Sequence, residues 1–197
     1  MGLTLNSNSL ALEAVGGGGG SAAAGLSEAN VNTLIKAKTE WTFITSLPVA
    51  DASVVSFEDI FDGTYTTVKA VGDDLDGSWW MYLRLRTAQG LETSNYGYFY
   101  DQGSGTTGGY RGGAASYVPF MHDSSRDHAK NFEIVLSGLN AARKTTGRFH
   151  SGHGNSSWDG SYTVGGFVYS ATRAVTGLQF QSNANMSSGT IKIYGLN

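Results

Sequence analysis

The residues best suited to recognition chemistry in this chain are aromatic side chains that stand beside hydrogen-bonding groups. A sugar ring stacks its apolar face on an aromatic ring while its hydroxyls seek donors and acceptors. The candidate contacts for a host-surface glycan or another receptor are Tyr96, Tyr98, Tyr110, Arg111, Trp158 and Asp159. A row of tyrosines on one strand face more often packs in a core or a subunit interface, and this alternative stays open.

Groups that could ligate a metal gather in two places. Residues 150–153 read His-Ser-Gly-His, and residues 122–128 hold two more histidines and two aspartates. On a strand, a spacing of three puts two side chains on opposite faces, and the glycines at 152 and 154 indicate a turn. We therefore predict a polar surface loop and no metal site.

Three acidic residues, Asp73, Asp74 and Asp76, could serve a hydrolase or a calcium site. They lie between Gly72 and Gly77, which is the setting of a solvated turn between strands. No serine has the surroundings of a nucleophile elbow. The sequence predicts a protein that is not an enzyme, with no catalytic residues and no cofactor; a small carbohydrate-active enzyme is the least favoured alternative.

Composition indicates a β protein that depends on core area or subunit contacts. Charged residues make up 15% of the 197 residues, aromatic residues 12%, and there are 28 glycines and no cysteine. Thirteen basic residues against sixteen acidic ones give a formal net charge of −3 without a long basic run. We expect no binding of nucleic acid, and the sequence shows no apolar run long enough for membrane insertion.

The chain divides at a glycine tether. Residues 16–25, five glycines followed by Ser-Ala-Ala-Ala-Gly, have high backbone freedom and little area to bury. Residues 1–15 before the tether form a predicted docking arm, and residues 26–39 after it form a predicted short helix with Ser27 as its N-cap. The apolar residues of the arm, predicted to dock, are Leu3, Leu5, Leu10 and Leu12. The helix has a narrow apolar stripe, Val31, Leu34 and Ile35, which packs either on its own domain or between copies of the chain.

From residue 40 to residue 197, apolar residues recur at every second position in many segments, which is typical of strands. Residues 79–86 read Trp-Trp-Met-Tyr-Leu-Arg-Leu-Arg, which predicts a half-buried strand with one apolar and one polar face. About ten strands bounded by Gly, Asn, Asp or Ser follow this pattern. The predicted fold is all-β, an antiparallel jelly-roll-like sandwich preceded by the extended arm and the short helix. The glycine-rich stretch Gln102–Gly113 is interpreted as a mobile connection at one end of it.

Residues 41–197 resemble a β-sandwich domain found in structural proteins of tailed bacteriophages. The resemblance depends on four segments. They are Trp41–Ile44, Ser53–Phe57, the predicted strand of residues 79–86, and the C-terminal segment Ser-Gly-Thr-Ile-Lys-Ile-Tyr-Gly-Leu of residues 188–196. It implies a virion structural protein that projects a sandwich outward while its N-terminal segment docks on other phage virion proteins. A homotrimer is expected mainly from this resemblance.

The resulting functional hypothesis is a tail fibre or tail appendage whose sandwich faces the host surface. The alternative is a capsid decoration or head-fibre protein. Residues 1–25 lack a basic segment followed by an unbroken apolar stretch, so no signal peptide is expected, and the predicted localisation is the virion after synthesis in the host cytoplasm.

Overall fold

The computed structural model describes residues 2–5, 12–15, 40–77, 80–103, 108–122, 129–140, 143–154 and 160–197. It forms two compact units, Met1–Glu40 and Trp41–Asn197. The described residues contain strands and no helix. The predicted tether and the predicted helix with Val31, Leu34 and Ile35 lie outside the described residues. No helix able to span a membrane occurs in the part of the chain that is described.

The N-terminal unit contains a two-stranded antiparallel ribbon. Strand β1 (Gly2–Leu5) pairs with β2 (Leu12–Val15), and the register sets Leu3 opposite Ala14 and Leu5 opposite Leu12. Directly opposed positions, and positions two apart on one strand, share a face of a ribbon. These four positions therefore share one face, while Thr4 and Glu13 belong to the other. The fourth predicted docking leucine, Leu10, lies outside the described residues.

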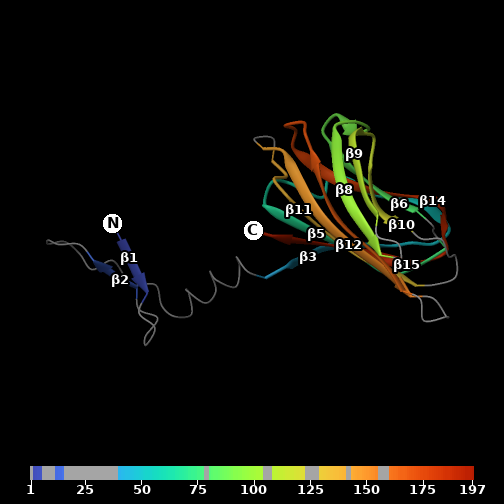
Figure 1. Ribbon diagram of the computed structural model, residues 1–197. Helices are drawn as coiled ribbons and strands as arrows, with labels where there is room; N and C mark the ends of the chain where they lie inside the picture. Colours follow the sequence, from blue (N-terminus) through green and yellow to red (C-terminus); the bar gives the residue numbers. More distant parts are fainter. Residues whose placement is uncertain are drawn as a thin grey trace. The chain divides into compact units, whose positions relative to one another are not determined.

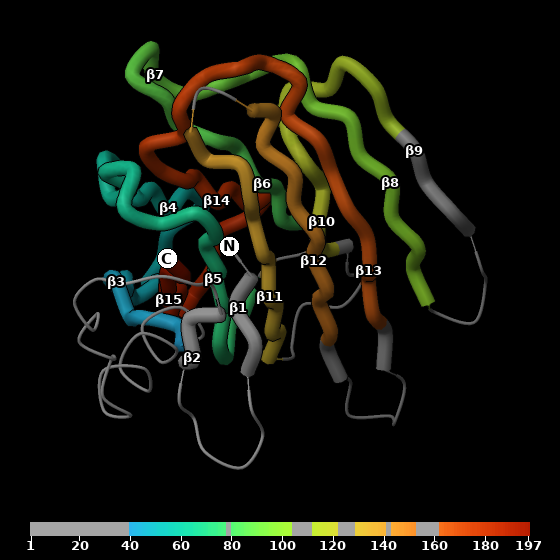
Figure 2. Tube along the Cα trace, turned by 90° about the vertical axis from the view of Figure 1, so that its left-hand side faces the viewer, coloured from blue at the N-terminus to red at the C-terminus, as the bar shows by residue number. Residues whose placement is uncertain are grey.

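The second unit consists of two antiparallel sheets (Figure 1). The larger sheet has eight strands in the order β3 (Thr42–Pro48), β15 (Ser188–Leu196), β5 (Thr67–Asp76), β11 (Lys130–Ser137), β12 (Thr145–Gly154), β13 (Gly160–Tyr169), β8 (Tyr96–Gly103) and β9 (Gly108–Ala115). The smaller sheet has the order β10 (Val118–His122), β6 (Trp80–Thr87), β14 (Val175–Met186) and β4 (Ala52–Phe57), with β7 (Gly90–Leu91) also paired to β6. Figure 2 shows β11, β12, β13, β8 and β9 following one another across the larger sheet.

The two sheets pack face to face around an aromatic core, which confirms the expected β-sandwich. The Phe120 ring of β10 lies 4.8 Å from the Phe132 ring of β11 and 6.1 Å from the Phe180 ring of β14, between ring centroids. The alternation predicted for β6 is also present, because Met81, Leu83 and Leu85 are fully buried whereas the residues between them are partly exposed.

Glycines inside the strands leave room for aromatic rings from neighbouring strands. A Cβ atom on Gly72 would overlap the Phe132 ring, and one on Gly147 would overlap the Phe167 ring. Much of the high glycine content thus belongs to the sheets as well as to the turns.

Three local predictions need correction. Residues Asp73, Asp74 and Asp76 lie at the end of β5 rather than in a free turn; Asp74 has a φ of 54°, and the pairing register of β5 with β15 shifts here. Residues 150–154 continue β12 instead of turning. The predicted mobile connection of residues 102–113 contains the end of β8 and most of β9, because backbone pairing does not require large side chains.

Candidate functional site

Tyr96 is part of the core. Its side chain is 0% exposed, its hydroxyl accepts a hydrogen bond from the Leu85 amide at 2.8 Å, and it donates to the Glu92 carbonyl oxygen at 3.2 Å. A side chain enclosed in this way has no surface to offer a ligand. This corrects the prediction of Tyr96 as a glycan contact, and packing is the role that the structure gives it.

Tyr98 lines an open apolar groove at one side of the larger sheet. The groove has a volume of about 630 Å³ and is lined by Gly97, Tyr98 and Phe99 of β8, Gly112 of β9, and Phe167 and Val168 of β13. The Tyr98 ring stacks on that of Tyr100 at 6.1 Å between centroids. The structure thus places Tyr98, one of the predicted contact residues, in a groove.

Two further predicted contacts, Tyr110 and Arg111, belong to β9. The backbone register of β9 sets Tyr110 opposite Tyr100 and Arg111 opposite Phe99, so both residues belong to the strand that borders the groove. Trp158 and Asp159 lie outside the described residues.

Sequence reasoning missed the exposed apolar residues of the same region. Phe99 is 61% exposed, Tyr162 55% and Val164 47%, and they belong to the paired strands β8 and β13. The signal was present in the sequence, because Phe99 stands between two tyrosines of a strand and must therefore point to the face opposite theirs.

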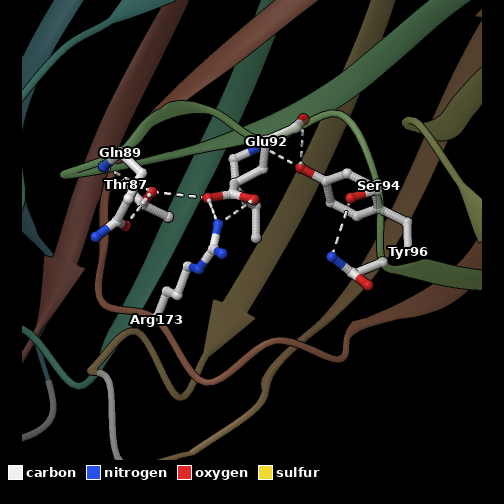
Figure 3. Close-up of polar contacts among 8 residues, drawn as sticks. Thr87, Gln89, Glu92, Ser94, Tyr96 and Arg173 are labelled. Carbon is white, nitrogen blue, oxygen red and sulfur yellow. Dashed lines mark hydrogen bonds and ion pairs between the residues drawn. The ribbon is translucent and has the colours of Figure 1, made fainter.

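A buried acidic group lies at one end of the sandwich (Figure 3). The side chain of Glu92 is 6% exposed, and its carboxylate accepts hydrogen bonds from the Thr87 hydroxyl at 2.8 Å and from Arg173 Nη1 at 2.9 Å. Tyr169 faces the same carboxylate, but its hydroxyl forms no hydrogen bond of normal geometry among the described residues. The cluster ties the segments after β7 and after β13 to the sandwich.

Burial and neighbouring groups shift the pKa values of Glu92 and Tyr169. Burial acts to raise the pKa of Glu92, but the hydroxyl groups and Arg173 around it outweigh burial and hold the pKa below its ordinary value. Burial, with the Glu92 charge beside it, raises the pKa of Tyr169 to about 12. Since the acid stays ionised and paired, the cluster suits stabilisation rather than proton transfer.

No metal centre is evident in the described residues, which contain no group of three or more His, Cys, Asp or Glu side chains placed to hold an ion. His150 lines a second groove, of about 500 Å³, together with Glu133 and Asp73. These two acids already pair with Lys69 at 3.7 Å and Lys192 at 3.0 Å, respectively. Of the predicted metal-ligand candidates, residues 123–128 lie outside the described part.

Comparison with known proteins adds little. No protein-family model matches the chain, and no curated protein does. One solved structure, named "Putative DNA-binding protein" from Ralstonia eutropha JMP134, is similar at 9% identity over 82% of this chain and 85% of that chain, with a TM-score of 0.30. A similarity this weak supports no inference about fold or function.

Proposed function

We propose that this chain is a structural protein of a bacteriophage virion, a tail fibre or tail appendage that docks through its N-terminal ribbon and turns its sandwich to the host surface. The observation that carries the proposal is the division into a small ribbon and a separate sandwich. Such a division suits a protein that must be held at one end and make contacts with the other.

The ribbon is the proposed docking element. An isolated two-stranded ribbon is marginally stable in water and gains stability by packing its apolar face on another surface. The positions of Leu3, Leu5, Leu12 and Ala14 share one face of the ribbon, as a docking face requires. The occupant of that face in this proposal is another virion protein.

The sandwich is, in this proposal, a jelly roll with two added strand pairs. If β3, β4, β5, β6, β10, β11, β14 and β15 are numbered 1 to 8, one sheet contains the order 1-8-3-6 and the other the order 5-4-7-2. Two Greek keys folded together give this order. The pairs β8–β9 and β12–β13 then extend the larger sheet beyond β11.

The proposed receptor-facing surface is the groove that contains Tyr98. Its apolar walls suit the stacking of a sugar ring. The groove lies on β8, β9 and β13, which belong to the two strand pairs added to the eight jelly-roll strands.

Self-association as a homotrimer is also part of the proposal. The exposed side chains of Phe43, Leu47 and Val54 give the sandwich further apolar surface that association could bury. Light scattering of the purified chain at micromolar concentration tests this point, and a monodisperse monomer would contradict it.

Electron cryomicroscopy of particles purified from the phage that encodes the chain tests the function as a whole. We expect density for the sandwich at the tail, in few copies, with the ribbon against a tail protein. Density in many copies over the icosahedral shell would replace the fibre assignment by capsid decoration. Absence of the chain from purified particles would overturn both.

A further inference from the structure

The outer face of the smaller sheet carries a pair of aromatic rings that lies away from the Tyr98 groove. Tyr82 of β6 and Tyr117, which directly precedes β10, have ring centroids 4.4 Å apart and planes inclined at 56°. Both side chains are half-buried, and Tyr82 alternates with the buried Met81 and Leu83. The two rings therefore form an apolar platform that is open to the outside.

A positioned guanidinium lies beside this platform. Arg84 Nε donates a hydrogen bond to the Ser116 carbonyl oxygen at 3.2 Å, Nη1 donates to Gln181 Oε1, and the group lies 5.9 Å from the Tyr117 ring centroid. These bonds use two of the five guanidinium N–H groups and fix the plane of the fork. The other N–H groups of the Arg84 guanidinium remain to donate to a planar acceptor such as a carboxylate.

The neighbouring strand continues the polar surface. Gln181 of β14 is opposite Tyr82 and Gln179 is opposite Arg84, while Gln179 Nε2 donates to the Ser56 hydroxyl of β4 at 3.2 Å. Gln179 is buried, whereas Gln181 is partly exposed and offers its carboxamide at a fixed position beside the aromatic rings. A positioned carboxamide of this kind is a suitable hydrogen-bond partner for a sugar hydroxyl.

The two arginines of β6 on this face differ in their partners. Arg86, two residues from Arg84 on the same strand, pairs with Glu58 at 3.0 Å between Nη2 and Oε1. Among the described residues Arg84 has no carboxylate partner, although its side chain is partly buried. A carboxylate is the acceptor that matches the planar fork of an arginine, so a carboxylate on a ligand would complement the remaining donors of Arg84.

We propose that this face binds an acidic oligosaccharide, with Arg84 holding a sugar carboxylate through its fork and the Tyr82 and Tyr117 rings contacting the sugar ring. The partly exposed Gln181 carboxamide meets the hydroxyls. The inference deepens the proposed function, on which it rests for its biological setting. Binding in solution and location in the particle are separate measurements, so either can fail alone.

The test is binding of the full chain to an immobilised panel of oligosaccharides that contain uronate or sialate, with the carboxyl-reduced form of each as its partner. We expect at least one acidic member to bind and its carboxyl-reduced form to lose at least about tenfold in affinity. Arg84→Gln should lose a similar factor, and Arg84→Lys should recover only part of it because a lysine lacks the fork.

Arg86→Gln is the matched control, since it removes one charge from the same face of the same strand but leaves Arg84 in place. It should bind like the original chain. Amide chemical-shift changes on ligand addition should map to β6, β14 and residues 116–117. Failure of every acidic member to bind, equal binding of the reduced forms, or shifts confined to β8 and β9 would overturn the inference; the last result would still agree with the Tyr98 groove as a receptor site.

Discussion

Arg173 Nη1 lies 2.9 Å from the carboxylate of the buried Glu92, and this pair joins the loop after β7 to the segment between β13 and β14. Arg173 is itself half-exposed, whereas Glu92 is almost fully enclosed. The acid therefore depends on its hydrogen bonds, because a buried carboxylate that loses a donor retains its desolvation cost.

The first prediction concerns the Thr87 hydroxyl, which donates to Glu92 Oε1 at 2.8 Å. Thr87→Val keeps the side-chain shape and removes this donor, and we expect the free energy of unfolding to fall by about 1–2 kcal/mol. Urea unfolding followed by circular dichroism measures the change. Thr93→Val, at an exposed position nearby, is the control and should be close to neutral. Equal effects of the two substitutions would show that the hydroxyl does not support the buried acid.

The second prediction concerns acid stability. The folded-state pKa of Glu92 is below the value for an unfolded chain, so the unfolded state takes up the proton first as the pH falls. The stability contributed by Glu92 is thus present above about pH 5 and is lost as the pH falls through the folded-state pKa. Urea midpoints measured from about pH 6 to about pH 3 should decline less steeply in Glu92→Gln than in the original chain. Parallel declines would contradict the assignment.

The third prediction uses two glycines of neighbouring hairpins. A Cβ on Gly165 of β13 would press on the Phe99 carbonyl oxygen and lie 2.6 Å from both the Phe149 ring and Tyr100 Cβ, whereas a Cβ on Gly113 of β9 meets nothing within 4 Å. Gly165→Ala should therefore lower the free energy of unfolding by about 1–3 kcal/mol or more. Gly113→Ala should change it by about 0.5 kcal/mol or less. Thermal melts of the two variants side by side give the comparison.

The period-two pattern predicted the larger unit well where side chains alternate strongly. Most of the predicted strand of residues 79–86 lies in β6, where Met81, Leu83 and Leu85 are fully buried, and Ile191 and Ile193 of the closing strand are buried as well. Residues 108–115 gave no such signal, since Gly-Gly-Tyr-Arg-Gly-Gly-Ala-Ala has few side chains to alternate. That segment forms a strand because β8 supplies hydrogen-bond partners for its backbone, which is tertiary information.

The candidate site was predictable only in part for the same reason. Tyr98 was recognised from its residue type, but its groove also requires Phe167 and Val168 from β13, about seventy positions later in the chain. Likewise, Arg84 and Tyr82 were expected on an outer face, while their contacts with Tyr117 and Gln181 depend on strand pairing that a single sequence does not specify.

The fourth prediction concerns the docking face of the ribbon. If the shared face of Leu3, Leu5, Leu12 and Ala14 attaches the chain to the particle, the double substitution Leu5→Ser and Leu12→Ser should abolish incorporation, because the paired leucines would no longer bury apolar area. The matched control is Thr4→Ser with Glu13→Ser, a pair of opposed positions on the other face of the same ribbon. Incorporation is measured as the amount of chain per purified particle by quantitative mass spectrometry. The melting temperature of each free variant should match that of the original chain, since the ribbon and the sandwich are separate units. Normal incorporation of the leucine variant, or equal loss in both variants, would rule out this face as the attachment surface.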